Sequence, residues 1–432
     1  MTQIRPKERD AVIKSLRAGV VPRYGQHLIQ VGRKKEIETL ISDIACIADG
    51  GSCFRLVIGE YGSGKTFFLN LIRSIGIEKK LVVANADLNP DRRLHSSGGQ
   101  ARSLYAELMR NMCTRTKPDG GALGSIVEKF IIHAKSEADS SGLDIHAVIQ
   151  GKLDQIKEMV SGYDFADVIA AYCKGFEDGN EQLKSDAIKW LRGEFSTKTD
   201  AKHALGVRSI IDDASIYDQL KLLALFVRLA GYAGLLINLD EMVNIYKLAN
   251  VQSRNSNYEQ ILRILNDSLQ GNTVGLGFIL GGTKEFLTDT RRGLYSYPAL
   301  QSRLSQNSFA TNGLIDFNGP VIQLSSLDPE NFYVLLENIR HVYAAGEKEQ
   351  YLLPDKAITG FMEYCHNKIG NAYFKTPRTT IISFIDLLAV LEQNPQAKWE
   401  DLLGSIKIES DAGAIAELSV ENENDEMASF QM

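Results

Sequence analysis

The sequence predicts an α/β fold built around a five-stranded parallel sheet. Two observations carry this prediction: short runs that are apolar at every position, and helical patterns between those runs. Runs of this kind are typical of strands buried on both faces, which occur in parallel sheets covered by helices. A third observation is a glycine-rich segment, Gly59–Thr66, between the first run and the first helical pattern. It places a candidate functional site at the end of a strand.

The predicted elements alternate along the chain. Five runs are predicted as strands: Cys53–Ile58, Leu81–Ala86, Leu235–Leu239, Leu276–Leu280 and Val321–Leu324. Helical patterns occupy Thr66–Ile75, Gly99–Cys113, Ile216–Ala230 and Tyr258–Leu269. This alternation of strand and helix is the signature of an α/β domain.

One connection is too long for that pattern. Thr66 and Asp240 are 174 residues apart, whereas two further strand–helix units need roughly 60–70 residues. The surplus falls at about 114–207, a polar stretch with helical periods at Ile126–Ala134 and Leu143–Val160 and no convincing strand. We therefore expect a helical insertion there.

The chain changes character after Leu324. Helical patterns follow one another at Pro329–Ala345, Pro354–Ile369, Thr379–Glu392 and Ala397–Leu403. They indicate a small helical lid domain. The predicted organisation is a basic N-terminal arm at 1–31, a nucleotide-binding core at 32–325, the lid at 326–405 and an acidic, mobile tail at 406–432.

Composition narrows the class of protein. The chain has 432 residues, of which 44% are hydrophobic and 24% charged, as in globular proteins of two or three domains. Its five cysteines are scattered without a C-x-x-C pair, which favours a reducing compartment over a disulfide framework or a zinc site. Charged residues stand where a secretory leader needs apolar ones, and no stretch reads as a membrane span. We expect a cytoplasmic protein.

Charge is unevenly distributed. The formal net charge is −6, but residues 1–35 hold nine lysines and arginines against Glu8 and Asp10. Such an arm can meet an acidic neighbour or the phosphates of DNA, the latter through Arg5, Arg9 and Arg17. A solvated amphipathic helix at Glu8–Ala18 explains the same pattern equally well.

The glycine-rich segment has the pattern G-x-x-x-x-G-K-[ST] in full. It reads Gly59-Glu60-Tyr61-Gly62-Ser63-Gly64-Lys65-Thr66. Glycines let the backbone wrap a phosphate with amide groups pointing inward at a helix N-terminus. The pattern predicts that Lys65 reaches the β- and γ-phosphates of ATP and that the Thr66 hydroxyl binds Mg²⁺.

A buried strand that ends in carboxylates supplies the second half of this site. Asp240 and Glu241 follow directly after the apolar run Leu235–Leu239. A carboxylate at this edge of a parallel sheet can hold Mg²⁺, so we assign Asp240 as a metal residue. Glu241 is then placed to polarise the attacking water.

The order of these parts resembles the AAA+ ATPases, which have a P-loop core and a helical lid. By this resemblance Arg33, in Gly32-Arg33-Lys34-Lys35-Glu36, lies near the adenine. Thr283, after the run Leu276–Leu280, corresponds to the sensor of the γ-phosphate, and Arg378, in Thr376-Pro377-Arg378, to the second sensor.

AAA+ sites usually lie between subunits, so the resemblance also implies a homo-oligomer in which a neighbour supplies an arginine. Arg291, Arg292 and Arg303 occupy the expected part of the chain, and Arg303 is preferred because Leu300 and Leu304 would fix a helical turn around it. Arg291 and Arg292, beside Gly293, are expected to be a mobile, solvated pair. An ion pair with a surface carboxylate remains an equal alternative for Arg303.

A narrower resemblance covers most of the chain. The segments Leu16–Pro22 and Ser97–Leu108, with Glu60-Tyr61 inside the phosphate loop, resemble the ATP-binding proteins of bacteriophage-exclusion (BREX) systems, the BrxC/BrxD group. This implies a role in defence against phage, with DNA and a helicase-like protein as partners.

Two alternatives to the hydrolysing ATPase are a molecular switch and a small-molecule kinase. A molecular switch would bind ATP and change partners without sustained turnover, and Glu241 favours hydrolysis over it. A small-molecule kinase is disfavoured because the insertion, the sensor-like Thr283 and the lid would be superfluous. We expect no C-terminal winged helix for DNA, since too few residues follow Leu403, so any DNA contact would come from elsewhere.

Overall fold

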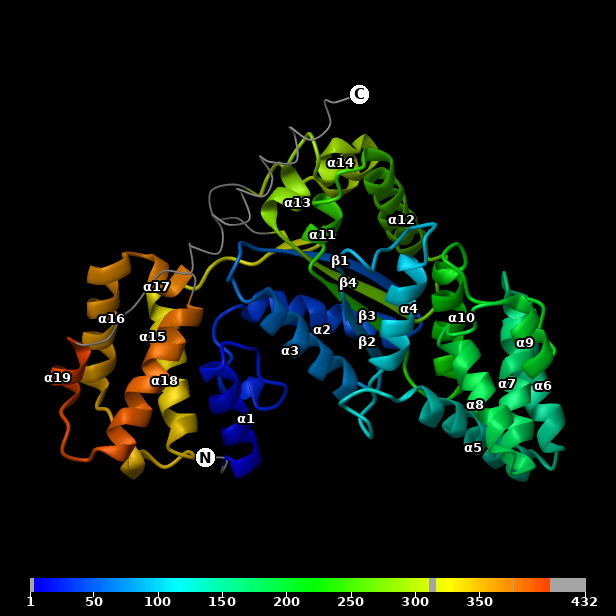
Figure 1. Cartoon of the computed structure of the whole chain (residues 1–432), viewed down its shortest axis with the longest axis horizontal. Helices are drawn as coiled ribbons and strands as arrows, with labels where there is room; N and C mark the ends of the chain where they lie inside the picture. Colours follow the sequence, from blue (N-terminus) through cyan, green and yellow to red (C-terminus); the bar gives the residue numbers. More distant parts are fainter. Residues whose placement is uncertain (1–3, 311–315, 376, 405–432) are drawn as a thin grey trace. The chain divides into compact units, whose positions relative to one another are not determined.

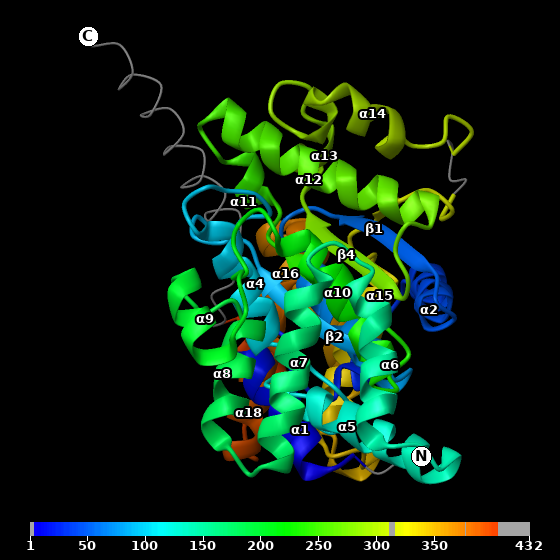
Figure 2. The same cartoon turned by 90° about the vertical axis from the view of Figure 1, so that its right-hand side faces the viewer.

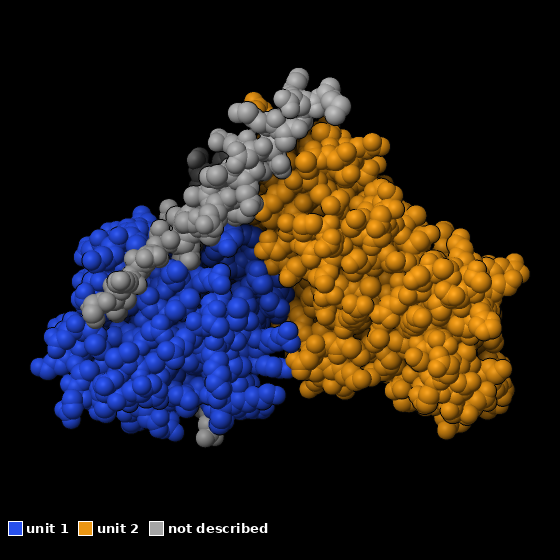
Figure 3. All heavy atoms as spheres, in the orientation of Figure 1, with its two compact units in different colours: residues 1–34, 59–71, 324–432 blue, residues 35–58, 72–323 orange. Residues whose placement is uncertain are grey.

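The computed structural model describes residues 4–310, 316–375 and 377–404. The chain divides into two compact units, coloured separately in Figure 3. Unit 1 takes its described residues from 1–34, 59–71 and 324–432, and unit 2 from 35–58 and 72–323. The predicted tail at 406–432 and Thr376 lie outside the described residues.

Unit 2 contains the predicted five-stranded parallel sheet. Its strands are β1 (Ser52–Ile58), β2 (Val82–Asp87), β3 (Leu235–Asp240), β4 (Leu276–Gly282) and β5 (Val321–Gln323). They are ordered β2-β3-β4-β1-β5, and every neighbouring pair is parallel. All six residues of β3 are buried, which is why the strand reads as a continuous apolar run. The sheet is confirmed, with strand ends within two residues of those predicted.

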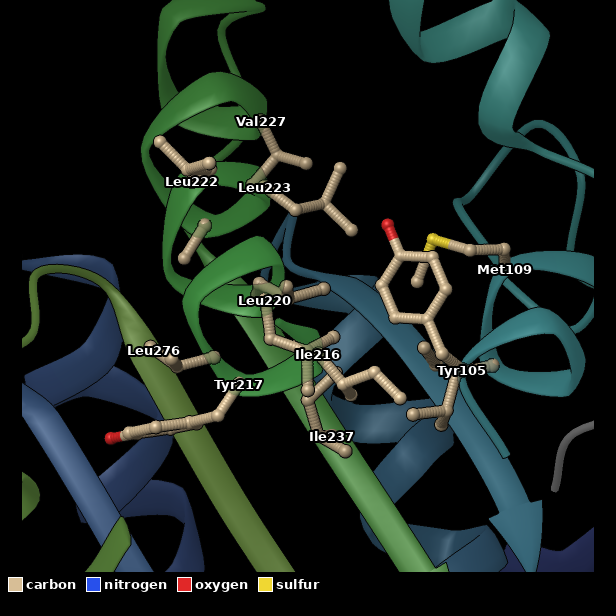
Figure 4. Close-up of a cluster of buried hydrophobic side chains, with 14 of the residues drawn as sticks. Tyr105, Met109, Ile216, Tyr217, Leu220, Leu222, Leu223, Val227, Ile237 and Leu276 are labelled. Atoms are coloured by element: carbon tan, nitrogen blue, oxygen red, sulfur yellow. The ribbon is translucent and has the colours of Figure 1, made fainter. Parts of the chain in front are cut away.

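Helices cover both faces of the sheet (Figure 1). Helix α2 (Lys34–Ala48) and the unit 2 part of α3 (Lys65–Glu78) lie on one face, where Ile47 approaches Gly277 and Gly76 approaches Val83 and Leu236. The other face is covered by α4 (Gln100–Arg110), α10 (Ile216–Leu229) and α12 (Val251–Gln270). Figure 4 shows side chains of α10 beside Ile237 of β3 and Leu276 of β4, with Tyr105 and Met109 of α4 on the same side of the sheet. Glycine at 76 and 277 lets the helices approach closely, because a β-carbon there would press on these side chains.

The surplus residues between β2 and β3 form a helical group beside α10 (Figure 2). These helices are α5 (Leu123–Ser141), α6 (Ile145–Lys157), α7 (Gly162–Glu177), α8 (Glu181–Leu191) and α9 (Lys198–Leu205). Their core is continuous with that of the sheet. The ring of Phe226 on α10 lies 5.2 Å from Phe130 and 5.8 Å from Phe165, and Phe165 lies 6.4 Å from Trp190.

The C-terminal helices of unit 1 surround a second core. They are α15 (Pro329–Tyr343), α16 (Asp355–Ile369), α17 (Ala372–Lys375), α18 (Arg378–Gln393) and α19 (Trp399–Leu403). Helix α1 (Pro6–Arg17) packs against α15 and α18. Arg9 Nε donates to the Tyr343 carbonyl at 2.8 Å, and Arg17 Nε pairs with Asp386 at 2.8 Å. The basic N-terminal segment is therefore held within unit 1.

Short helices complete the fold. They are α11 (Val243–Tyr246), α13 (Lys284–Thr288), α14 (Pro298–Leu304) and the 3₁₀ turns η1 (Gln26–Leu28), η2 (Leu294–Ser296) and η3 (Lys348–Gln350). In the part of the chain that the structure describes, no helix combines the length and apolarity needed to cross a lipid bilayer.

A distant carboxylate caps helix α4. The residue before the helix is Gly99, with φ 92°, and it offers no side chain to the free amide groups. Asp213 replaces that cap: it accepts hydrogen bonds from Gly99 N at 2.7 Å and Arg102 N at 2.8 Å, and from the Ser96 hydroxyl at 2.7 Å. A carboxylate at a helix N-terminus is favoured by both the amide donors and the helix dipole.

We predict that Asp213→Ala lowers the free energy of unfolding by about 2–4 kcal/mol, because three donors lose a charged acceptor. Urea denaturation followed by circular dichroism measures this. Asp212→Ala is the matched control, since among the described residues that carboxylate accepts only from Ser215 N, at 3.1 Å; it should cost less than about 1 kcal/mol. Equal losses in the two variants would contradict the long-range cap.

Candidate functional site

The glycine-rich segment connects a strand to a helix N-terminus. Strand β1 ends at Ile58 and α3 begins at Lys65. Gly62 and Gly64 have φ of 75° and 81°, in the left-handed region that favours glycine. A β-carbon on Gly59 would collide with the Ser63 hydroxyl. The loop therefore adopts a tight conformation that only glycine accommodates, as a cradle for an anion requires.

The side chains of this loop fit a phosphate ligand. Lys65 Nζ donates to the carbonyl oxygens of Gly59 at 3.0 Å and Glu60 at 2.9 Å, so the ammonium group lies against the loop. Ser63 is only 5% exposed, and its hydroxyl has no hydrogen-bond partner among the described residues. Thr66, in the first turn of α3, is exposed. A cation, a buried hydroxyl and an accessible hydroxyl on one glycine-rich loop suit a phosphate and its metal ion.

Arg33 contacts the same loop within unit 1. Its Nη2 donates to the Ser63 carbonyl, and its guanidinium lies 5.9 Å from the centre of the Phe68 ring. Gly32 and Arg33 both have positive φ, of 62° and 57°. This turn brings the predicted base-side residue directly against the phosphate loop.

Arg378 is the first residue of α18 and is exposed. Its side chain lies against Gly19, where a β-carbon would come within 2.7 Å of the Arg378 Nε. Gly19 has φ 68°, so both conformation and space favour glycine there. The segment Leu16–Pro22, singled out in the sequence, therefore contains the position that accommodates Arg378.

The end of β3 carries the two predicted carboxylates within unit 2. Asp240 is 7% exposed, and its Oδ1 accepts from Glu241 N at 2.9 Å. Glu241 is exposed and has φ 57°, which is uncommon for a residue with a side chain. The buried strand thus ends in one sheltered and one accessible carboxylate.

A third carboxylate at this edge was not predicted. Asp87 ends β2 in register with Asp240 on β3. Burial of its carboxyl group, and secondarily the negative charge of Asp240, raises the pKa of Asp87. The sequence carried a signal for it, because Asp87 follows the apolar run Leu81–Ala86 just as Asp240 follows Leu235–Leu239.

Thr283 follows β4, which pairs with both β1 and β3. Its hydroxyl accepts from Phe286 N at 3.4 Å and caps α13. The residue thus lies at the same edge of the sheet as Asp240, and the structure gives it a helix-capping contact.

Arg303 lies in unit 2 on α14, where Leu300 and Leu304 are both fully buried. The Arg303 side chain is exposed, and Nη1 donates to the Ala299 carbonyl at 2.9 Å. Arg292 is less solvated than expected: it is half-buried, with its guanidinium 5.5 Å from the centre of the Tyr246 ring. Its Nη2 also donates to the Leu248 carbonyl at 3.5 Å, so Arg292 contacts the segment after β3.

The comparisons with known proteins identify the family. A family model described as BREX system ATP-binding protein BrxC/D matches residues 4–407. No curated protein matches the chain. The match spans both units and includes the glycine-rich loop, the Asp240–Glu241 pair and α18. The chain therefore belongs to the BREX system ATP-binding protein BrxC/D family.

Proposed function

We propose that the protein is a Mg²⁺-dependent ATPase of the AAA+ class that works in anti-phage defence with DNA and a helicase-like partner. The observation that carries the proposal is the glycine cradle at Gly59–Gly64, with Lys65 against it, in a chain of an ATP-binding family. The family description supports ATP and the BREX system; hydrolysis and the partners are our inference.

The sheet supports the roles of the individual residues. Because β1, β4 and β3 are parallel neighbours, their carboxyl ends lie at one edge, and the phosphate loop follows β1 directly in the chain. Thr66 and Asp240 would hold Mg²⁺, which when bound neutralises phosphate charge. Lys65 would contact the β- and γ-phosphates, and Glu241 would take up a proton from the attacking water.

The AAA+ assignment draws on the order of the strands and on the residues after their carboxyl ends. Strand β4, between β1 and β3, is followed by Thr283, and the helices of unit 1 after β5 supply a lid that begins with α15. In this proposal Thr283 senses the γ-phosphate, Arg33 lies on the base side of the nucleotide and Arg378 turns toward the phosphates when ATP is bound.

Steady-state phosphate release, measured with and without DNA, tests the proposal. Sustained turnover that requires Mg²⁺ supports an ATPase, whereas tight ATP binding with a single round of cleavage at most would favour a switch. Native mass measurement with ATP, with ADP and without nucleotide determines whether ATP drives assembly.

Arg303 is proposed to act on the site of a neighbouring subunit. We expect Arg303→Ala to bind ATP with unchanged affinity and to lose at least about tenfold in turnover, since an arginine supplied in trans stabilises charge as the phosphate is cleaved. Adding Lys65→Ala subunits, which keep Arg303, should restore part of the activity in mixed assemblies. Phosphate release from defined mixtures measures both effects.

Arg291→Ala is the matched control, because Arg291 is an exposed arginine in the same connection between β4 and β5. It should hydrolyse ATP at the wild-type rate. The shared-site model fails for Arg303 if its alanine variant is fully active, or if mixing restores nothing.

A further inference from the structure

Glu241 has an unusual backbone that its neighbours hold in place. Its φ of 57° lies in the left-handed region, which is unfavourable for a residue with a side chain. Glu241 N donates to Asp240 Oδ1 at 2.9 Å, and the next amide, Met242 N, donates to the Gly281 carbonyl of β4 at 3.0 Å. The backbone on both sides of Glu241 is therefore fixed to the sheet.

Asn244 completes this arrangement with its side chain. Its Nδ2 donates to two carbonyl oxygens, that of Leu88 at 2.8 Å and that of Glu241 at 3.2 Å. Its backbone N also donates to the Glu241 carbonyl, at 3.0 Å. One carboxamide thus joins the turn after β3 to the residue after β2.

The Leu88 side of this link is itself anchored. Leu88 N donates to the Asp240 carbonyl at 3.0 Å, and the preceding residue, Asp87, is in register with Asp240. The contacts therefore form a closed circuit through Leu88, Asp240, Glu241 and Asn244. Such a circuit restricts the direction in which the exposed Glu241 side chain leaves the strand.

We infer that Asn244 is a positioning residue that holds Glu241 in the left-handed conformation from which its carboxylate meets the attacking water. This inference rests on the proposed role of Glu241 in hydrolysis. Only an amide fits both contacts at this length: aspartate would turn a carboxylate oxygen toward two carbonyl oxygens, and alanine would release both.

Kinetics of Asn244→Ala test the inference. We expect kcat to fall roughly tenfold, because a displaced catalytic group loses alignment, and KM for ATP to stay within about twofold, because binding residues are untouched. Asn244→Asp keeps the shape without the donor and should show the same loss of kcat. It also serves as the second variant if the alanine protein folds poorly.

A double-mutant cycle distinguishes positioning from general weakening of the fold. If Asn244 acts through Glu241, then Asn244→Ala in a Glu241→Gln background should change the residual single-turnover rate by less than about twofold. Asn250→Ala is the matched control: that asparagine caps α12 by accepting from Ser253 N at 2.9 Å. It should leave kcat and KM near wild type despite the lost cap.

The outcomes separate the two hypotheses. If Glu241→Gln slows hydrolysis but Asn244→Ala does not, or if Asn244→Ala costs the same factor in both backgrounds, the positioning role is overturned and the proposed function stands. If Glu241→Gln hydrolyses ATP at the wild-type rate, the proposed role of Glu241 fails, and the role of Asn244 fails with it.

Discussion

Glu241→Gln is expected to slow ATP hydrolysis by a factor on the order of 10² to 10⁴ while ATP stays bound. The amide preserves the shape of the side chain but cannot accept a proton from water. Because Glu241 is exposed and Asp240, which we assign to the metal, is sheltered, the substitution should spare nucleotide affinity. Single-turnover phosphate release gives the rate, and equilibrium binding of ATP gives the affinity.

Glu285→Gln is a suitable control for this variant. Glu285 is an exposed glutamate on α13, close in sequence to Thr283. Its amide variant should hydrolyse ATP within about twofold of wild type. The Glu241→Gln protein should also trap whatever assembly ATP favours, which native mass measurement detects. Unchanged turnover in Glu241→Gln would remove this residue from the mechanism and favour the alternative function, a molecular switch that binds ATP without sustained turnover.

Lys65→Ala is expected to raise the dissociation constant for ATP by roughly a hundredfold, because the variant loses charge-assisted hydrogen bonds to the phosphates. The variant also removes two hydrogen bonds that Lys65 makes to the carbonyl oxygens of Gly59 and Glu60. The loop thus loses both its cation and a brace for its conformation. Isothermal titration calorimetry with Mg²⁺ and ATP measures the effect.

Lys79→Ala is the matched lysine variant for this measurement. Lys79 is exposed just after the end of α3, and its replacement should leave ATP affinity unchanged. Circular dichroism should show the same helix content in both proteins. A dissociation constant for Lys65→Ala within threefold of wild type would show that Lys65 does not make the phosphate contact.

The sequence predicted the sheet well because its strands are buried on both faces. Burial at every position produces unbroken apolar runs such as Leu235–Leu239. Such a run can be recognised as a strand without knowing which elements pack against it. The helices α7, α8 and α9 were not individually predicted, because their polar residues obscure the period that packs inward. Pattern thus identified the strands, while the bounds of the insertion helices depend on the surfaces they pack against.

In the candidate site, too, the sequence reveals features with a local pattern and misses those that depend on distant contacts. The loop at Gly59–Thr66 is contiguous and carries its own pattern, so the sequence alone was enough to find it. Asn244 and Asp213 act through contacts with residues far away in the chain, Leu88 and Gly99. No local pattern marks such residues, since an asparagine or aspartate in a loop is common whatever it contacts.

The basic N-terminal segment makes contacts within unit 1 that bear on how DNA binding should be tested. Arg9 donates to the Tyr343 carbonyl and Arg17 pairs with Asp386, an acidic neighbour, while their contact with DNA stays a prediction. Reversing them to glutamate would place a like charge of residue 17 beside Asp386 and one of residue 9 near Glu392, and would disturb the packing of α1. A changed salt dependence in that variant would therefore have two causes, and exposed Lys7 is the better residue to replace in a DNA-binding assay.

The aromatic contacts of Phe226 bear on how unit 2 can be divided. Its ring lies against Phe130 and Phe165 of the inserted helices, while α10, which carries it, also packs on β3. Excising 114–207 would leave Phe226 and the apolar side of α10 facing water, so the sheet would not survive as a minimal fragment. Unit 2 should therefore unfold in one cooperative transition. A displacement of the inserted helices would be passed through α10 to β3, the strand that ends in Asp240.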